Sequence, residues 1–363
     1  MVAVGSDTGG SVATSDDVVK NGPMLRRFAR VASSIAVILA GAVVPLGPGS
    51  VAGAAPAPPG GTDAGGGLRV VNYNILHGTF CDDTTSCQAP DRVDLFLRQL
   101  EAAGCPEVVG LQEVSDTLRA LFAARLRTVC GGDYRAVFAQ VQGNDKEYVL
   151  TSLPARKATV LDLPGGLRSA SRVELTSDAG PVVLVVTHQD GDNTFPSCRS
   201  DIDRYKCPKP CPEGTTFPAC QTILGQRLAE QGGPERAIRI YMGDFNVPAG
   251  TPRHSGLLAD GWVDTHLKAG NPECDPATGV QCTAGRDDKT IATLKDPSAR
   301  EQERIDFIFV KAPGCAARFD PSADPDGDGT GTGLFAATPA VNGPGGLVWP
   351  SDHTAVSMDM TCG

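Results

Sequence analysis

IRIYMGDFNV, at residues 238–247, is an apolar run of β type that ends in a carboxylate, Asp244, and a carboxamide, Asn246. Alternate side chains of a strand leave it on the same face, so these two groups are expected side by side where the strand ends. A carboxylate beside a carboxamide suits a water to be activated and a phosphate oxygen to be held. The stretch therefore predicts a strand that brings polar chemistry to the edge of a sheet.

Other short segments, most of them also ending apolar runs, carry polar side chains of the same kinds. They are NYNILHG with Asn74, LQEV with Glu113, THQDGD with His188, RIDFIFV with Asp306, and SDH with Asp352 and His353. Taken singly, each side chain is as easily a loop cap or a structural residue. Taken as an ordered series, they predict a metal-dependent phosphoester hydrolase, which must neutralise phosphoryl charge, position a water and protonate a leaving oxygen.

The residue types also suggest how the work is divided. Glu113 ends the apolar run VVGLQE and is the expected primary ligand of Mg²⁺, a cation that prefers oxygen ligands, with Mn²⁺ able to substitute. Asn74 can support the same cation or hold the phosphate. A carboxylate that faces an imidazole fixes its tautomer and raises its basicity, so Asp306 and His353 are expected to form a dyad. His188 is the second available imidazole.

Alternation of apolar residues and the density of β-branched ones predict more strands than helices. The expected strands are 68–76, 107–114, 134–141, 148–153, 171–175, 182–188, 238–245, 305–310 and 354–360, and the expected helices are 92–103, 116–129, 222–231 and 254–267. Helices fall between only some of the strands. This order predicts an α/β fold in which two mixed sheets pack face to face with helices on the outside.

The ordered set of motifs resembles the endonuclease/exonuclease/phosphatase superfamily, over about residues 68 to 360. That group contains pancreatic-type deoxyribonuclease, apurinic endonucleases, neutral sphingomyelinases and inositol polyphosphate 5-phosphatases. The resemblance implies a four-layer α/β/β/α sandwich with the site at one edge of the two sheets. It makes Glu113 the metal ligand with Asn74 beside it, and it places Asp352 at the metal or the water.

The resemblance also implies roles for the remaining residues. Asp244 orients the attacking water, Asn246 contacts phosphate, Asp306 pairs with His353, and His188 stabilises phosphoryl oxygens or acts as an acid. Glu147, in KEYVLTS, stands where deoxyribonuclease-like members have a carboxylate partner for His188, and Arg168 stands at a phosphate-contacting position.

The substrate class stays open between several members of that group. Glu147 and Arg168 favour an endonuclease-like phosphodiesterase acting on nucleic acid, whereas Ser115 replaces a groove-inserting arginine of the pancreatic branch. The alternatives are a sphingomyelinase or phospholipase C-type lipid phosphodiesterase, disfavoured by an aromatic content of 5%, and an inositol phosphate phosphatase. A non-enzymatic binding module would be expected to lack one of the acidic or imidazole positions, and none is missing.

Cysteine usage and the N-terminal region predict export. Twelve cysteines, all from Cys81 onward and without a convincing zinc spacing, predict a disulfide framework, in which Cys81 with Cys87 and Cys274 with Cys282 could close single loops.

Residues 1–54 form the expected signal peptide region, with Met24 as the expected true start and a basic, then apolar, then small-residue pattern. The export route is left open. We expect a secreted protein without a transmembrane anchor, and no feature indicates a stable protein partner or an oligomeric state.

The rest of the chain is expected to be one catalytic domain, 68–363, after a flexible leader, 55–67. Removal of residues 1–54 takes away four basic and three acidic residues and leaves a net charge of −11, which gives no global attraction for polyanions. Phosphate recognition must then be local.

Two segments interrupt the pattern of strands and helices. Residues 189–221 are expected to form a cysteine-rich insertion, and 311–351 a long connection. Within that connection, Asp324, Asp326 and Asp328 precede a glycine, as in the first half of a calcium loop, but the closing glutamate is absent. The alternatives are a weak structural Ca²⁺ site and a solvated acidic linker.

Overall fold

The structure is a computed structural model of the 363-residue chain. The residues that it describes are 66–82, 85–137, 146–192, 196–199, 206–322 and 331–363. The expected signal region, the leader up to residue 65 and the half calcium loop with Asp324, Asp326 and Asp328 lie outside these residues, and Gly67, the last residue of the expected leader, begins β1.

Strands form two mixed sheets. The first sheet has the order β11 (Ala317–Phe319), β13 (Ala355–Cys362), β1 (Gly67–Asn74), β2 (Val108–Gln112), β4 (Tyr148–Thr151), β3 (Arg135–Val137), with β12 (Gly333–Phe335) also paired to β13. The second has the order β5 (Ala155–Asp162), β6 (Ser169–Ser177), β7 (Gly180–His188), β8 (Ile238–Asp244), β10 (Asp306–Lys311), β9 (Val263–Asp264). Each sheet contains one parallel pair, β1 with β2 and β7 with β8, and a helix lies between the two strands of each pair in sequence.

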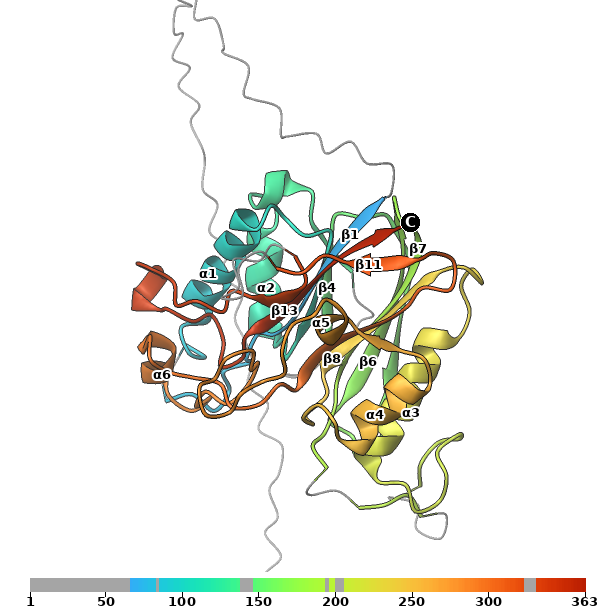
Figure 1. Ribbon diagram of the computed structural model, residues 1–363. Coiled ribbons are helices and arrows are strands. Elements are labelled where there is room, and N and C mark those ends of the chain that lie inside the picture. Colours follow the sequence, from blue (N-terminus) through green and yellow to red (C-terminus); the bar gives the residue numbers. More distant parts are fainter. Residues whose placement is uncertain (1–65, 83–84, 138–145, 193–195, 200–205, 323–330) are drawn as a thin grey trace, which may run out of the picture. The chain divides into compact units, whose positions relative to one another are not determined.

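Helices cover the outer faces of the sheets. They are α1 (Ala89–Ala102), α2 (Asp116–Arg125), α3 (Phe217–Glu230), α4 (Pro252–Ala259), α5 (Thr265–Lys268), α6 (Ile291–Lys295) and the short 3₁₀ turns η1 (Cys130–Gly132) and η3 (Pro344–Gly346). Figure 1 shows α1 and α2 beside β1, β4 and β13, and α3 and α4 on the side of β6 and β8. The predicted four-layer α/β/β/α sandwich is therefore confirmed.

Three large apolar clusters separate these layers. The central one joins side chains such as Val70 and Met358 of the first sheet to Val186 and Ile240 of the second. A cluster around Phe96 lies between the first sheet and its helices, and another lies between the second sheet and α3 and α4. None of the helices in the described ranges has the length and apolar character to cross a bilayer.

Gly110 of β2 allows the two sheets to come close together at their centre. A Cβ built on Gly110 would lie 2.2 Å from Cε of Met242 and 2.9 Å from Cγ2 of Val186, both on the opposite sheet. Contacts this short would force the side chains of Met242 and Val186 to shift, so a larger side chain would disturb the packing between the sheets. The close approach matters to function because polar groups of both sheets meet beyond the ends of these strands.

Some expected elements differ from those observed. The predicted helix 254–267 is confirmed only at its two ends, in α4 and α5, because β9 interrupts it: Val263 and Asp264 pair with β10, and the Asp264 carboxylate then caps α5. Helix α3 starts earlier than expected, at Phe217, because the Thr216 side chain accepts a hydrogen bond from the Ala219 N–H. The segment 311–351 is not one long connection, since β11 and β12 pair with β13.

Disulfide bonds account for all twelve cysteines. The two short pairings that the spacing suggested, Cys81–Cys87 and Cys274–Cys282, are both present. The remaining four bonds are Cys105–Cys130, Cys198–Cys207, Cys211–Cys220 and Cys315–Cys362. The sulfurs of Cys198, Cys207 and Cys220 lie close enough for a metal ion, but they are all used in disulfides.

A buried ionic network fixes the entry to β10. The Arg304 guanidinium donates to Oδ2 of Asp264 at 2.9 Å and to the Glu273 carboxylate, and Nε2 of His254 lies 3.1 Å from the same Asp264 oxygen. Burial would raise the pKa of Asp264, but the hydrogen bond from His254 and the charge of Arg304 lower it to about 2. Arg304 stands two residues before Asp306, so this network holds a strand that ends in the candidate site.

The lowered pKa of Asp264 predicts acid sensitivity. Because the folded-state pKa is below the ordinary value of 3.8, the ion pair contributes its full stability above about pH 4 and loses it as the pH falls toward 2. The contribution is about 2 kcal/mol. The free energy of unfolding of the wild type should therefore exceed that of Asp264→Asn at pH 6, with the gap narrowing between pH 4 and pH 2. Denaturant titrations at each pH measure this gap, and a gap independent of pH would contradict the assignment.

Candidate active site

Neighbouring strands of the second sheet bring three polar side chains into one row. In β8, Met242 lies in the core between the sheets, so Asp244, two residues further on, points the same way. The parallel register pairs His188 of β7 with Asp244, and the antiparallel register pairs Asp306 of β10 with the same residue. Residues far apart in sequence thus meet because their strands end at a common edge.

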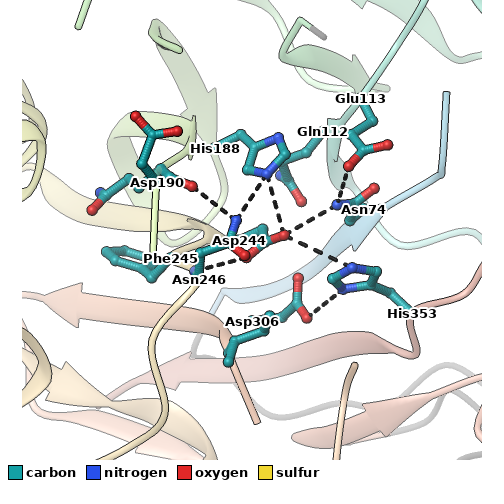
Figure 2. A network of polar contacts seen from close by, with 12 residues as sticks. Asn74, Gln112, Glu113, His188, Asp190, Asp244, Phe245, Asn246, Asp306 and His353 are labelled. Atoms are coloured by element: carbon teal, nitrogen blue, oxygen red, sulfur yellow. Dashed lines mark hydrogen bonds and ion pairs between the residues drawn. The ribbon is translucent and has the colours of Figure 1, made fainter. Parts of the chain in front are cut away.

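Asp244 is the hub of this arrangement, as Figure 2 shows. Its Oδ2 accepts a hydrogen bond from Nδ2 of Asn74 at 3.1 Å and lies 3.4 Å from Nε2 of His188 and 3.8 Å from Nε2 of His353. Its Oδ1 accepts from the Asn246 backbone N–H at 2.8 Å. With 1% of its surface exposed, Asp244 has one imidazole on each side.

His353 is held between carboxylates. Its Nδ1 lies 2.9 Å from Oδ2 of Asp306, which leaves Nε2 directed toward Asp244. Burial raises the pKa of Asp306 to about 6, where the charge of His353 opposes the shift and that of Asp244 favours it. Burial acts to lower the pKa of His353, but the Asp306 and Asp352 carboxylates outweigh it and raise this pKa well above its ordinary value. The imidazole is thus fixed in orientation and made more basic.

Glu113 belongs to the first sheet's side of the site. It follows β2 with a left-handed φ of 60°, and its carboxylate accepts hydrogen bonds from Nδ2 of Asn74 and from the His77 backbone N–H, both at 3.0 Å. Burial acts to raise the pKa of Glu113, but the positive charges of His188 and His77 and these hydrogen bonds hold it below its ordinary value. The side chain is 16% exposed, so an ionised carboxylate remains accessible to a ligand.

Oxygen donors near Glu113 fit a hard cation. Burial raises the pKa of Asp352, and the negative charge of Glu113 contributes to the shift, so the two carboxylates act on each other. A divalent cation would relieve that repulsion. In the orientation shown, Asn74 directs its nitrogen to both Glu113 and Asp244, while its oxygen accepts from the Leu76 N–H. Glu113 and Asp352 are therefore the better ligands, and Asn74 joins them to Asp244.

Asp244, Asp306 and His353 form a separate group, whose donor atoms lie within 4.8 Å of one another. Here the nearest contact is the hydrogen bond between Asp306 and His353. An ion at this point would have to break that bond. The chemistry of the donors thus favours the Glu113 side for the cation and leaves this group to handle protons.

Arg168 and Asn246 complete the other side of the site. Nη1 of Arg168 lies 2.7 Å from Nδ1 of His188, and Nε donates to Asp190 at 2.8 Å. Nδ2 of Asn246 lies 3.0 Å from Nε2 of His188. Glu147 is buried and accepts a hydrogen bond from the Ser169 hydroxyl. The expected pairing of Glu147 with His188 stays a prediction.

Sequence reasoning missed several residues that shape the site. His77 lies within the segment NYNILHG and Asp190 within THQDGD, so both are close in sequence to predicted site residues, and that closeness could have identified them. Arg253 has no such sequence signal. It is buried on α4 and donates to the carbonyl oxygens of Asp190 and Phe245, which connects the loops after β7 and β8.

Arg286 also lacks a sequence signal. Its guanidinium donates to the carbonyl oxygen of His353 at 3.0 Å and to the Thr354 hydroxyl at 3.2 Å. It forms an ion pair with Glu301 and lies 3.7 Å above the Trp349 ring. Arg286 thus anchors the loop that carries Asp352 and His353.

Comparison with known proteins agrees with this geometry. Residues 71–353 match the model of the Endonuclease/Exonuclease/phosphatase family. The chain therefore belongs to that family, a class of phosphoric ester hydrolases, which confirms both the resemblance carried by the motifs and the predicted enzyme class. A comparison with curated proteins gave no match.

Solved structures share the fold at low sequence identity. Truncated TDP2 from Caenorhabditis elegans has a TM-score of 0.53 at 16% identity, over 82% of this chain and 98% of that one. TDP2 from D. rerio, in complex with single-strand DNA product, has a TM-score of 0.53 at 17% identity, over 81% and 98%. The mannosyl-6-phosphatase of Bacteroides thetaiotaomicron has a TM-score of 0.53 at 17% identity, over 81% and 99%. At these identities the likeness concerns the fold.

Proposed function

We propose that this protein is a secreted, Mg²⁺-dependent phosphodiesterase that acts on nucleic acid. The observation that carries the proposal is the position of Asp244 between two imidazoles, His188 at 3.4 Å and His353 at 3.8 Å, with the Glu113 carboxylate linked to it through Asn74. This arrangement offers one place for a cation and another for proton transfer, which phosphodiester hydrolysis requires.

The cation, held by Glu113 and Asp352 beside Asn74, would neutralise charge on the phosphoryl oxygens and orient the substrate. Asp244 takes the proton of a water as the water oxygen attacks phosphorus, and His353, held by Asp306, orients that water. Arg168 and Asn246 hold phosphoryl oxygens. His188 lies between these residues and Asp244, and it protonates the leaving oxygen as its bond to phosphorus breaks.

Nucleic acid is the favoured substrate among those the site could serve. A structural neighbour, TDP2, carries a single-strand DNA product, and Arg168 lies beside His188 where a phosphate oxygen could be gripped. Another neighbour is a mannosyl-6-phosphatase, so the same fold also serves a phosphate monoester. Purified mature protein should therefore be assayed in parallel on plasmid DNA, RNA, sphingomyelin, inositol phosphates and mannose 6-phosphate. The proposal expects the highest kcat/KM on a nucleic acid, and a preference for any other substrate would contradict it.

Export is supported by two independent features. All twelve cysteines are paired, as expected for a protein folded in an oxidising compartment. The N-terminal sequence has the basic, apolar and small-residue pattern of a signal peptide. N-terminal sequencing of the protein recovered outside the cell would find the cleavage point, expected near Ala54.

Chelation is expected to abolish activity. The Glu113 and Asp352 carboxylates repel each other, and a cation that they bind would offset this repulsion and act on the phosphate. EDTA should remove all hydrolysis of a generic phosphodiester, and added Mg²⁺ or Mn²⁺ should restore it. Full activity in the presence of EDTA would contradict the assignment, and circular dichroism in EDTA checks that the fold is retained.

A further inference from the structure

Phe80 is an unusual surface residue at the rim of the site. Its side chain is 69% exposed, and among the large exposed hydrophobic side chains of the described residues it is the only aromatic one. It lies in the loop that follows β1 and its ring meets the His77 ring edge-on, with centroids 5.5 Å apart and planes at 71°. A ligand that covers an exposed aromatic ring removes apolar surface from water, which is favourable. The position of Phe80 beside the polar groups of the site therefore suggests a role in binding.

His77 connects this ring to the proposed cation ligand. Its backbone N–H donates to Oε2 of Glu113 at 3.0 Å. Its Nδ1 accepts from the Thr79 N–H at 2.8 Å, and its Nε2 lies 3.6 Å from the same carboxylate oxygen. The His77 ring thus lies between Phe80 and the Glu113 carboxylate and contacts both.

The loop that carries Phe80 is fixed from several directions. The Cys81–Cys87 disulfide closes it, and the Asp82 carboxylate accepts a hydrogen bond from the Ile291 N–H at 3.2 Å. Gly78 has a φ of 70°, and a Cβ there would lie 2.5 Å from the carbonyl oxygen of Ser86, so no other residue fits. The ring is therefore presented in place before a substrate arrives, which reduces the entropic cost of binding to it.

We propose that Phe80 is a specificity residue that stacks on a nucleobase next to the phosphate being cleaved. The inference rests on the proposed nuclease function and names how that site recognises its substrate. Every base has a π-face, so one aromatic ring recognises nucleic acid regardless of sequence. The negative charge of this protein makes such a contact valuable, because a long basic groove that follows the phosphate backbone is not to be expected.

The charges near Phe80 favour a base over a bilayer. Asp82 follows in the same loop, and the neighbouring segment contains Asp287 and Asp288 with a single lysine, Lys289, whose carbonyl oxygen accepts from the Asp82 N–H. An aromatic ring on a loop with acidic neighbours is poorly suited to insertion among lipid headgroups, which attract basic and aromatic residues together. An uncharged, flat base meets no such barrier.

The test compares thymidylyl-thymidine with two analogues in which one base is replaced by hydrogen. Each substrate has a single phosphodiester, so the loss of one base is read directly as a change in kcat/KM. Wild type should lose about tenfold on one of the two analogues, as expected for a single stacking contact. Phe80→Ala should lose about the same factor on thymidylyl-thymidine and nothing further on that analogue. Phe80→Trp should keep the preference, and Val341→Ala, which removes an 88% exposed side chain, should behave as wild type.

Each other outcome overturns the inference in a recognisable way. An equal loss for Phe80→Ala on all three substrates would mean that the ring only supports the loop. A loss confined to sphingomyelin vesicles would mean that it contacts a membrane. Cleavage of another phosphoester, but of neither plasmid DNA nor RNA nor any of the three dinucleosides, would remove the nuclease function itself, and the stacking contact with it, while leaving the hydrolase class intact.

Discussion

Replacing Asp244 by asparagine should lower turnover by about 10²–10⁴-fold, the usual contribution of a positioned acid–base group. The asparagine fills the same space and can still accept the hydrogen bond from the Asn246 N–H. It cannot take a proton from water, and it no longer offers a negative charge to His188 and His353, whose Nε2 atoms lie 3.4 and 3.8 Å away. The measurement is kcat on bis(p-nitrophenyl) phosphate at saturating Mg²⁺.

Asp162→Asn is the matched control for this experiment, because it makes the same chemical change at an exposed position at the end of β5. It should have wild-type turnover. Far-ultraviolet circular dichroism and a thermal melt of both variants check that the fold is intact. Unchanged kcat for Asp244→Asn in a folded protein would exclude Asp244 from proton transfer.

Glu113→Gln should reduce both cation affinity and turnover. The glutamine keeps the shape of the side chain, but its single oxygen can accept from only one of the two donors, Asn74 or the His77 N–H, and it brings no charge to the cation. Because a cation contributes several kcal/mol and about 1.4 kcal/mol corresponds to tenfold, kcat/KM should fall on the order of 10²-fold. The Mg²⁺ concentration at half-maximal activity should rise.

The exposed Glu303 provides the control, and Glu303→Gln should leave the Mg²⁺ dependence unchanged. A Glu113→Gln variant with reduced turnover but unaltered Mg²⁺ dependence would contradict the ligand assignment. It would instead place Glu113 with the groups that orient the substrate.

The core strands and their polar ends were predictable because both follow local rules. Apolar periodicity predicts β1, β7, β8 and β10. Asn74, His188, Asp244 and Asp306 each lie an even number of positions from apolar residues that face the other sheet, so they share that face. Sequence periodicity cannot say which strands are neighbours. The pairing of β7 and β10 with β8, which aligns three of these groups, is a property of the fold.

Short and exposed elements escaped prediction for physical reasons. The edge strand β5 contains no fully buried residue, and its apolar side chains alternate too weakly with polar ones to mark it in the sequence. The strands β11 and β12 have three residues each, so their stability comes from pairing with β13 and not from their own sequence. The helix predicted across 254–267 follows a helical pattern, but pairing of β9 with β10 overrides it.

The buried arginines illustrate a second limit. Arg253 and Arg286 each donate to two backbone carbonyl oxygens, which every residue has, so these contacts leave no pattern in the sequence. Each also pairs with a carboxylate, Asp192 or Glu301, that its own position in the sequence does not indicate. Arg304 donates to the carboxylates of Asp264 and Glu273, which lie 40 and 31 residues away in the sequence. Only the folded chain reveals that such residues fix the loops around the site.

The central claim is that groups from both sheets meet around one divalent cation on the Glu113 side of the site. The most direct measurement is an anomalous difference map from a crystal of the mature protein soaked in Mn²⁺. The account predicts one strong peak about 2.1 Å from a Glu113 carboxylate oxygen, next to Asp352 and absent from Glu113→Gln crystals. A peak between Asp244, Asp306 and His353, with none at Glu113, would contradict it.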